Sequence, residues 1–383
     1  MQVTEKAEKT IVVPVSFAWR IAAIVILLLA LMGDCLSVYF SHDDFMNLFE
    51  YVKQGPQVFR GLALFWSSDY YRPVGSVFYI GLYELFGFHP IPFRITTIVL
   101  LLINLALLIR VACLLLRSRQ LAALVGLLTC YLASGYELYY NFGTIYDLVC
   151  FTFIFGIFAL YLEPRQRDLP LGNWRIAAIC LLQILALESK EMAASVPLLI
   201  LAYEVVVKKV FRKKQFPWRS LFLLGAVGVI TLIFVIGKSH GPRSLMNNPA
   251  YHPHISASIY LKNVSIQLNN LCYTVKLFDG FRTGILLAAG LLTGFFFRSR
   301  VAIFGWLWFI IAMLPVAFIS PRTGFVLYIP EPGIAIAVVA TFSAALAKKT
   351  APPSRLAFLR PTGAFLFIVI FCLLAQFHFR NRS

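Results

Sequence analysis

Charged residues are scarce in this sequence, and their scarcity excludes an ordinary soluble domain. Only 13% of the 383 residues are Asp, Glu, Lys or Arg, whereas 60% are hydrophobic and the mean hydropathy is +0.80. Soluble domains are typically about half apolar and about a quarter charged. We therefore predict an integral membrane protein, and an all-α one, because a helix satisfies its own backbone hydrogen bonds in lipid.

Cysteine motifs are also lacking. The seven Cys residues lie mostly inside apolar runs and form no C-x-x-C pair, so neither a zinc site nor a disulfide framework is indicated. His89, His240, His252 and His254 lie in polar segments without a carboxylate cluster close by. The sequence therefore requires no cofactor, although its external acidic residues are compatible with a divalent metal.

Apolar runs long enough to cross a membrane recur along the chain. A spanning helix needs about 20 apolar residues. We predict a polytopic helical bundle of about eleven spans in one integral membrane domain, residues 1–383, with a core at 15–345, a linker and last span at 346–383, and no separate soluble domain. The predicted spans are 15–37, 93–116, 121–136, 144–162, 174–187, 192–207, 218–237, 283–297, 301–319, 325–347 and 362–379.

Basic residues set the predicted orientation. The net charge is +17, and most of the 34 Lys and Arg residues cluster in alternate, short gaps between the spans. Under the positive-inside rule these gaps and the N-terminus are cytoplasmic. The basicity therefore indicates membrane topology and not a nucleic-acid partner. No small-residue cleavage site follows the first apolar run, which we expect to be a retained helix.

Unusual polar residues concentrate on the predicted external side. A large first external loop begins at Asp43-Asp44, and its amphipathic segments 45–54, 59–66 and 74–88 are expected to be interfacial helices. A second polar loop covers 238–279. Acidic and basic groups together at the bilayer edge suit a phosphate-linked substrate, since Arg and Lys bind phosphate oxygens and a carboxylate can accept a proton.

Four sequence blocks, in this order, resemble those of GT-C-fold glycosyltransferases that use polyprenyl-phosphate sugars. They are Asp43-Asp44, Tyr71-Arg72-Pro73-Val74 with Phe86-Gly87-Phe88-His89-Pro90, Ser189-Lys190-Glu191, and Leu314-Pro315 with Arg322 and Tyr328-Ile329-Pro330. The class includes protein O-mannosyltransferases, the lipid A aminoarabinose transferase and mannosyltransferases with tetratricopeptide tails. This chain differs in carrying no soluble external domain and no tetratricopeptide repeats after the last block.

The resemblance implies an inverting transfer of a sugar from a polyprenyl-phosphate donor to an acceptor hydroxyl. The active site would face the periplasm of a bacterial inner membrane, and the acceptor would be a lipid, a glycan or a protein. Asp43 or Asp44 would be the general base, with Asp43 favoured. The implied donor-phosphate ligands are Arg72, Lys190 and Arg322, and the implied substrate-binding residues are Tyr71, Glu137, Glu188, Glu191 and His89.

Each assignment has an alternative. Asp44 could cap the helix that begins near Phe45, because Asp is favoured at helix starts, and the cations could extend toward lipid headgroups. A transporter or flippase of a lipid-linked sugar is the alternative function, and a non-enzymatic assembly partner is a third. No internal repeat is visible, and the span interiors are nearly free of charge apart from Asp147, which favours chemistry at the surface over passage.

Overall fold

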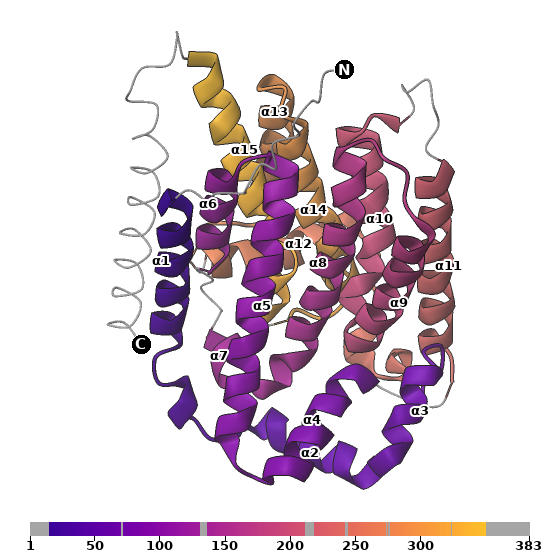
Figure 1. Ribbon diagram of the computed structural model, residues 1–383. Helices are drawn as coiled ribbons and strands as arrows, with labels where there is room; N and C mark the ends of the chain where they lie inside the picture. Colours follow the sequence, from indigo (N-terminus) through magenta and orange to yellow (C-terminus); the bar gives the residue numbers. More distant parts are fainter. Residues whose placement is uncertain are drawn as a thin grey trace, which may run out of the picture.

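The protein is a bundle of helices (Figure 1). The computed structural model describes residues 15–69, 72–130, 136–210, 218–241, 244–272, 274, 276–322 and 324–349, which contain no β-strand. This confirms the all-α class for the described part. The helices are α1 (Val15–Met32), α2 (His42–Gln54), α3 (Val58–Ala63), α4 (Pro73–Phe86), α5 (Pro90–Leu116), α6 (Arg119–Cys130), α7 (Tyr136–Tyr140), α8 (Ile145–Gln166), α9 (Asn173–Ser189), α10 (Val196–Ala202), α11 (Trp218–Ser239), α12 (Ala257–Leu271), α13 (Gly280–Phe296), α14 (Arg300–Ala317) and α15 (Glu331–Lys349).

Five of the described helical segments are long and apolar enough to cross a membrane. They are Phe17–Ser37, Pro90–Leu116, Phe142–Gln166, Trp218–Ser239 and Arg300–Ala317. Each coincides with a predicted span, and together they are consistent with a multi-pass membrane protein. α6 and the apolar part of α15 are shorter than the predicted spans at these positions, whereas α13, at 17 residues, covers 280–296 where 283–297 was predicted. The predicted span 362–379 lies outside the described residues.

Two predicted spans are interrupted. In place of one helix over 192–207, the chain forms a 3₁₀ turn at Glu191–Ser195, the short α10, and a π-helical turn at Tyr203–Val207. Near the C-terminal end, a 3₁₀ turn at Gly324–Tyr328 precedes α15. Apolar periodicity does not distinguish these turns from α-helix. Helix α12, which lies inside the predicted polar loop 238–279, was not predicted either.

The predicted interfacial segments are helices. In Figure 1, α2, α3 and α4 lie across the lower end of the bundle, inclined to the long helices. Gly55 ends α2 with a φ of 55°, a left-handed conformation that glycine adopts without steric cost. The three helices thus place Asp43 and Arg72 together at one end of the molecule.

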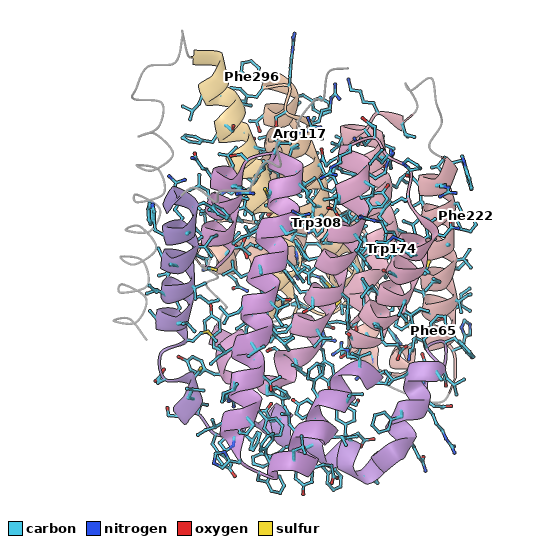
Figure 2. All side chains as sticks on the ribbon, in the orientation of Figure 1. Phe65, Arg117, Trp174, Phe222, Phe296 and Trp308 are labelled. Atoms are coloured by element: carbon cyan, nitrogen blue, oxygen red, sulfur yellow. The ribbon has the colours of Figure 1, made fainter. Side chains whose placement is uncertain are left out.

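Close packing of aromatic side chains forms the core. Figure 2 shows Trp308 within the bundle and Phe222 at its outer surface. Trp308 is fully buried and stacks near Phe155 and Phe158, with ring centroids 5.2 and 4.6 Å away. Phe222 is 59% exposed, as expected for a side chain that faces lipid. This pattern places the apolar surface of α11 outward.

The bundle interior holds more charge than the sequence analysis expected. Besides Asp147, Glu204 of the π-helical turn is buried within the predicted span 192–207. It accepts hydrogen bonds from Arg165 Nε and Nη2 at 2.8 and 2.7 Å and from the Tyr161 hydroxyl at 2.6 Å. A buried carboxylate is tolerated in such a setting because its charge is neutralised and its oxygens are hydrogen-bonded. The expectation of nearly uncharged span interiors was therefore wrong.

Candidate active site

Asp44 caps α2. The Ser41 backbone N–H donates to Asp44 Oδ2 at 2.8 Å, and the Asp44 N–H donates to Ser41 Oγ at 3.3 Å, which together form a capping box. The carboxylate is fully buried, accepts a hydrogen bond from the Tyr79 hydroxyl at 3.2 Å and lies 3.6 Å from Arg94 Nη2. Burial raises the pKa of Asp44, and the hydrogen bonds from Ser41 and the charge of Arg94 act against that rise. This position favours the structural alternative for Asp44.

Asp43 is exposed and open to a substrate. The side-chain amide of Asn141 donates a hydrogen bond to Asp43 Oδ2 at 3.3 Å. Asn141 is itself held by the Gly143 N–H and the Ser41 hydroxyl, which donate to its oxygen at 2.8 and 3.2 Å. The neighbouring turn therefore orients the Asp43 side chain without covering it, and Asp43 is the member of the pair that can act as a base.

A chain of polar contacts connects α2 with Arg72. Asn47, one turn after Asp43, accepts a hydrogen bond from the Tyr146 hydroxyl at 3.2 Å. The same hydroxyl pairs with that of Tyr51, and the Tyr146 ring lies beneath the Arg72 guanidinium, 5.3 Å from the ring centroid. Tyr146 thus contacts both α2, which carries Asp43, and the guanidinium of Arg72.

Arg72 forms a bidentate ion pair with Glu191. Arg72 Nη2 donates to both carboxylate oxygens at 2.7 and 2.8 Å, and Nε donates to Oε2 at 3.2 Å. Arg72 precedes α4 in a left-handed conformation, with a φ of 48°, which is uncommon for a residue with a side chain. Burial favours the neutral acid, but the charges of Arg72 and Lys190 outweigh it and lower the pKa of Glu191 to about 2. The pair is therefore ionised at neutral pH.

Lys190 is paired inside the bundle. Its Nζ donates to both oxygens of Asp147, at 2.6 and 2.5 Å, and both side chains are buried. The ammonium also lies 4.5 Å from the centroid of the Phe325 ring. Both charged residues stand out in the sequence, but their pairing was not predicted because they lie in different segments of the chain. In this arrangement Lys190 supports the neighbouring Glu191 electrostatically, and it does not line the cavity described next.

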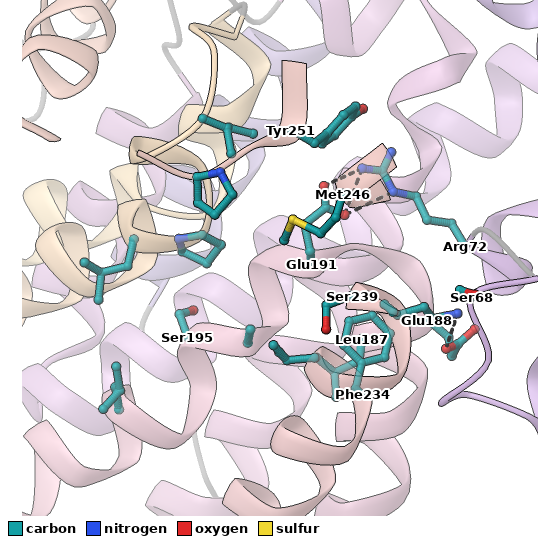
Figure 3. Close-up of a pocket in the computed structure, with 18 residues that line it drawn as sticks. Ser68, Arg72, Leu187, Glu188, Glu191, Ser195, Phe234, Ser239, Met246 and Tyr251 are labelled. Atoms are coloured by element: carbon teal, nitrogen blue, oxygen red, sulfur yellow. Dashed lines mark hydrogen bonds and ion pairs between the residues drawn. The ribbon is translucent and has the colours of Figure 1, made fainter. Parts of the chain in front are cut away.

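A cavity of about 380 Å³ lies beside the Arg72–Glu191 pair (Figure 3). Its polar lining comes from Ser68, Arg72, Glu188, Glu191, Ser195, Lys238, Ser239 and Tyr251, and its apolar lining comes from Leu187, Ala194, Leu198, Phe234, Val235, Met246, Pro253, Leu314, Pro315 and Ile319. Leu198 and Val235 are also 44% and 46% exposed on the outside of the bundle. The cavity therefore joins a charged end to an apolar wall at the molecular surface.

Glu188 and Lys238 form a second charged pair on this cavity. Lys238 Nζ lies 3.3 Å from Glu188 Oε1, yet neither oxygen of Glu188 has a hydrogen-bond partner among the described residues. The Glu188 side chain is 1% exposed. Burial raises the pKa of Glu188 to about 8, and the charge of Lys238 acts in the opposite direction. Lys238 was missed by sequence reasoning, which placed it at the start of a polar loop.

A glycine in α11 allows the α3–α4 connection to approach this pair. A Cβ atom at Gly237 would overlap the carbonyl oxygen of Trp66, so only glycine fits without displacing that backbone. The contact places Ser68 at the cavity beside Lys238. In Figure 3, Ser68 and Glu188 lie on the side of the cavity opposite Tyr251.

The remaining predicted residues lie around this cavity or away from it. Arg322 lies behind Tyr251, with its guanidinium carbon 4.3 Å from the ring centroid and a buried Nη2 that has no hydrogen-bond partner in the described ranges. Glu137 is in α7, and the exposed His89 precedes α5; neither lines the cavity. Tyr71 lies outside the described residues.

Neither similarity to known proteins nor a cluster of metal-binding side chains identifies the function of this chain. No family model matches the chain, and neither a curated protein nor a solved structure matches it. Within the described ranges, no three His, Cys, Asp or Glu side chains gather as a metal site would require. What the protein does must therefore be inferred from the cavity and its charged side chains.

Proposed function

We propose that this protein is a membrane glycosyltransferase that moves a sugar from a polyprenyl-phosphate donor to an acceptor hydroxyl. The observation that carries the proposal is the cavity, which combines an arginine at its polar end with apolar walls that reach the lipid-facing surface. A ligand with an anionic headgroup and a hydrocarbon tail matches both ends. A soluble anion would leave the apolar wall unused.

The apolar wall supports a lipid as the donor. Leu198 of α10 and Val235 of α11 line the cavity and are also exposed on the outer surface, where a membrane would surround the bundle. An isoprenoid tail could lie along this surface while the headgroup occupies the cavity. Van der Waals contacts between the tail carbons and this surface would add to the affinity.

Arg72 is suited to the donor phosphate. A guanidinium donates two parallel hydrogen bonds to a phosphate as well as to a carboxylate. Glu191 occupies these donors in the described state, and a phosphate that binds there would compete with it. Lys238 lines the same cavity, so two cationic side chains are available to an anionic ligand.

Asp43 is the proposed general base. Its exposed carboxylate would take the proton of the acceptor hydroxyl as that oxygen attacks the anomeric carbon. The bond between this carbon and the phosphate oxygen would break, and the lipid phosphate would leave with the bonding electrons. Arg72 would stabilise the charge that develops on the phosphate. A single displacement of this kind inverts the anomeric centre.

The finer architecture belongs to the same proposal. It comprises about eleven spans in a GT-C-like arrangement, a cytoplasmic N-terminus, and an active site on the periplasmic face of a bacterial inner membrane. The basic gaps between apolar runs support this orientation. Helices α2 to α4, which carry Asp43 and flank Arg72, would then lie at the external headgroup level.

A transporter of a lipid-linked sugar is the second candidate function. The broken helix supports it, because the 3₁₀ turn Glu191–Ser195 and the π-helical turn Tyr203–Val207 flank α10. Transporters often place substrate sites at such interruptions. In a transporter, Asp43 would have no chemical role, and substrate would cross the membrane unchanged.

The test is sugar transfer by the purified protein. Labelled polyprenyl-phosphate sugars would be supplied to wild type, Asp43→Asn and Arg72→Gln, with Lys53→Gln as an exposed control on α2 outside the cavity. We expect transfer by wild type and by the control, loss of transfer in Asp43→Asn, and a reduction of about tenfold or more in Arg72→Gln. Near-normal turnover by Asp43→Asn would contradict the assignment of the base. Donor crossing liposomes without transfer would support the transporter.

A further inference from the structure

Glu188 is a buried acceptor group that the chain itself leaves unused. Both of its carboxyl oxygens lack hydrogen bonds among the described residues, although the side chain is 1% exposed and lines the cavity. A buried polar group without a partner is unfavourable, and such groups in native proteins call for an explanation. A ligand in the cavity would supply the missing hydrogen bonds.

The surroundings of Glu188 indicate the chemistry of that ligand. Lys238 Nζ lies 3.3 Å from the carboxyl group, so a second cation at this place would be repelled. A further anion would be repelled by the negative charge of Glu188 when that carboxyl group is ionised. Neutral hydroxyl groups fit both neighbours, because a hydroxyl can donate to Glu188 and accept from Lys238. The hydroxyl of Ser68 lies on the same side of the cavity (Figure 3).

The geometry points to a sugar-binding subsite formed by Glu188, Lys238 and Ser68, in which hydroxyl groups of the donor headgroup donate to Glu188 and accept from Lys238. This inference rests on the proposed function, in which Arg72, which also lines this cavity, holds the donor phosphate. A volume of about 380 Å³ falls within the range of about 300–1,000 Å³ that is usual for small-molecule sites. One cavity can therefore hold a phosphate and the sugar attached to it.

The backbone supports this arrangement. Glu188 is in the last turn of α9 and Glu191 begins the following 3₁₀ turn, so the helix end at Lys190 separates the two carboxylates along one cavity wall. Gly237 allows the α3–α4 connection to approach α11 and thereby positions Ser68 beside Lys238. Three separate segments thus converge on the subsite, as expected for a recognition site held by rigid elements.

A purely structural ion pair would look different. Glu204 and Arg165, elsewhere in the bundle, form two hydrogen bonds of 2.7 and 2.8 Å, and Tyr161 completes the set. Glu188 and Lys238 have no comparable geometry, and a cavity lies next to them. The incomplete pair is therefore the one with capacity for a ligand.

The experiment compares two lipids that differ only in the sugar. A short-chain prenyl phosphate and the same prenyl phosphate carrying a hexose would be titrated into wild type, Glu188→Gln and Glu188→Leu. Glu163→Gln, which changes a partly exposed carboxylate outside the cavity, is the matched control. Folding of each variant would be verified by its thermal unfolding in detergent.

We expect wild type and the control to bind the hexose lipid at least about tenfold more tightly than the bare lipid. Glu188→Gln, which retains one acceptor oxygen, should lose part of this preference, and Glu188→Leu should lose it entirely. Affinity for the bare prenyl phosphate should stay within about threefold in both variants, because Arg72 is unchanged. This graded loss supports the subsite.

Three results would overturn the inference, and they are distinguishable. Equal affinity of wild type for the two lipids would overturn the sugar subsite. An equal loss of affinity for both lipids in the Glu188 variants would also overturn it. Neither result would contradict a phosphate site at Arg72. Failure of wild type to bind either lipid would overturn the proposed function and the subsite together.

Discussion

Two regions of the molecule hold buried carboxylates in contrasting states. In the π-helical turn that follows α10, Glu204 has two hydrogen bonds from Arg165 and one from Tyr161, and all three side chains are buried. In the last turn of α9, Glu188 is equally buried but has no hydrogen bond among the described residues, and a cavity adjoins it. The proposed sugar subsite therefore rests on the unused hydrogen-bonding capacity of Glu188 beside a cavity, and not on burial of charge alone.

The largest expected effect would come from breaking the complete pair. Glu204→Gln removes one charge and leaves Arg165 buried without compensation, so the free energy of unfolding should fall by about 3–5 kcal/mol. Glu188→Gln should cost less than half of this, because the carboxyl group of Glu188 has no hydrogen bond to lose among the residues that the structure describes. Thermal and denaturant unfolding in detergent would measure both. An equal decrease in the free energy of unfolding of the two variants would show that the two carboxylates contribute equally to stability.

The Asp pair permits a second comparison. Asp44→Asn weakens the capping box and removes the carboxylate facing the buried Arg94, so unfolding should become easier by about 2 kcal/mol. Asp43→Asn changes an exposed side chain and should alter stability by about 0.5 kcal/mol or less. The same unfolding assay checks this. A larger loss in Asp43→Asn than in Asp44→Asn would reverse the assigned roles.

The raised pKa of Glu188 also predicts a dependence of stability on pH. The folded-state pKa of Glu188 is raised from 4.5 to about 8, so the folded protein keeps a proton that the unfolded chain releases. This contribution to stability is fully present below pH 4.5 and is lost as the pH rises to about 8. The melting temperature of wild type should therefore fall more between pH 5 and pH 8 than that of Glu188→Gln. Parallel curves would show that Glu188 titrates normally.

Several features of the candidate site could be predicted from local sequence. The capping alternative for Asp44 followed from the preference of Asp for helix starts, although the N-cap of α2 is Ser41 and Asp44 completes its capping box. The helix break around Lys190 followed from the polar run between two apolar segments. Arg72 and Glu191 were both singled out from short polar blocks. Their pairing was not predicted, because they are 119 residues apart and only packing brings them together.

The sequence by itself determined that the chain is a helical membrane protein, because hydrophobic content and run length decide whether a segment is more stable in lipid than in water. It also indicated where α4 begins and where polar groups interrupt the apolar runs, whereas α2 begins at His42, three residues before the predicted start at Phe45. The tertiary structure decided which charges neutralise one another and which border a cavity. Lys190 pairs with the buried Asp147, whereas Lys238 lines the cavity. The sequence does not show this difference, because the energy of a buried charge depends on neighbours that lie far away along the chain.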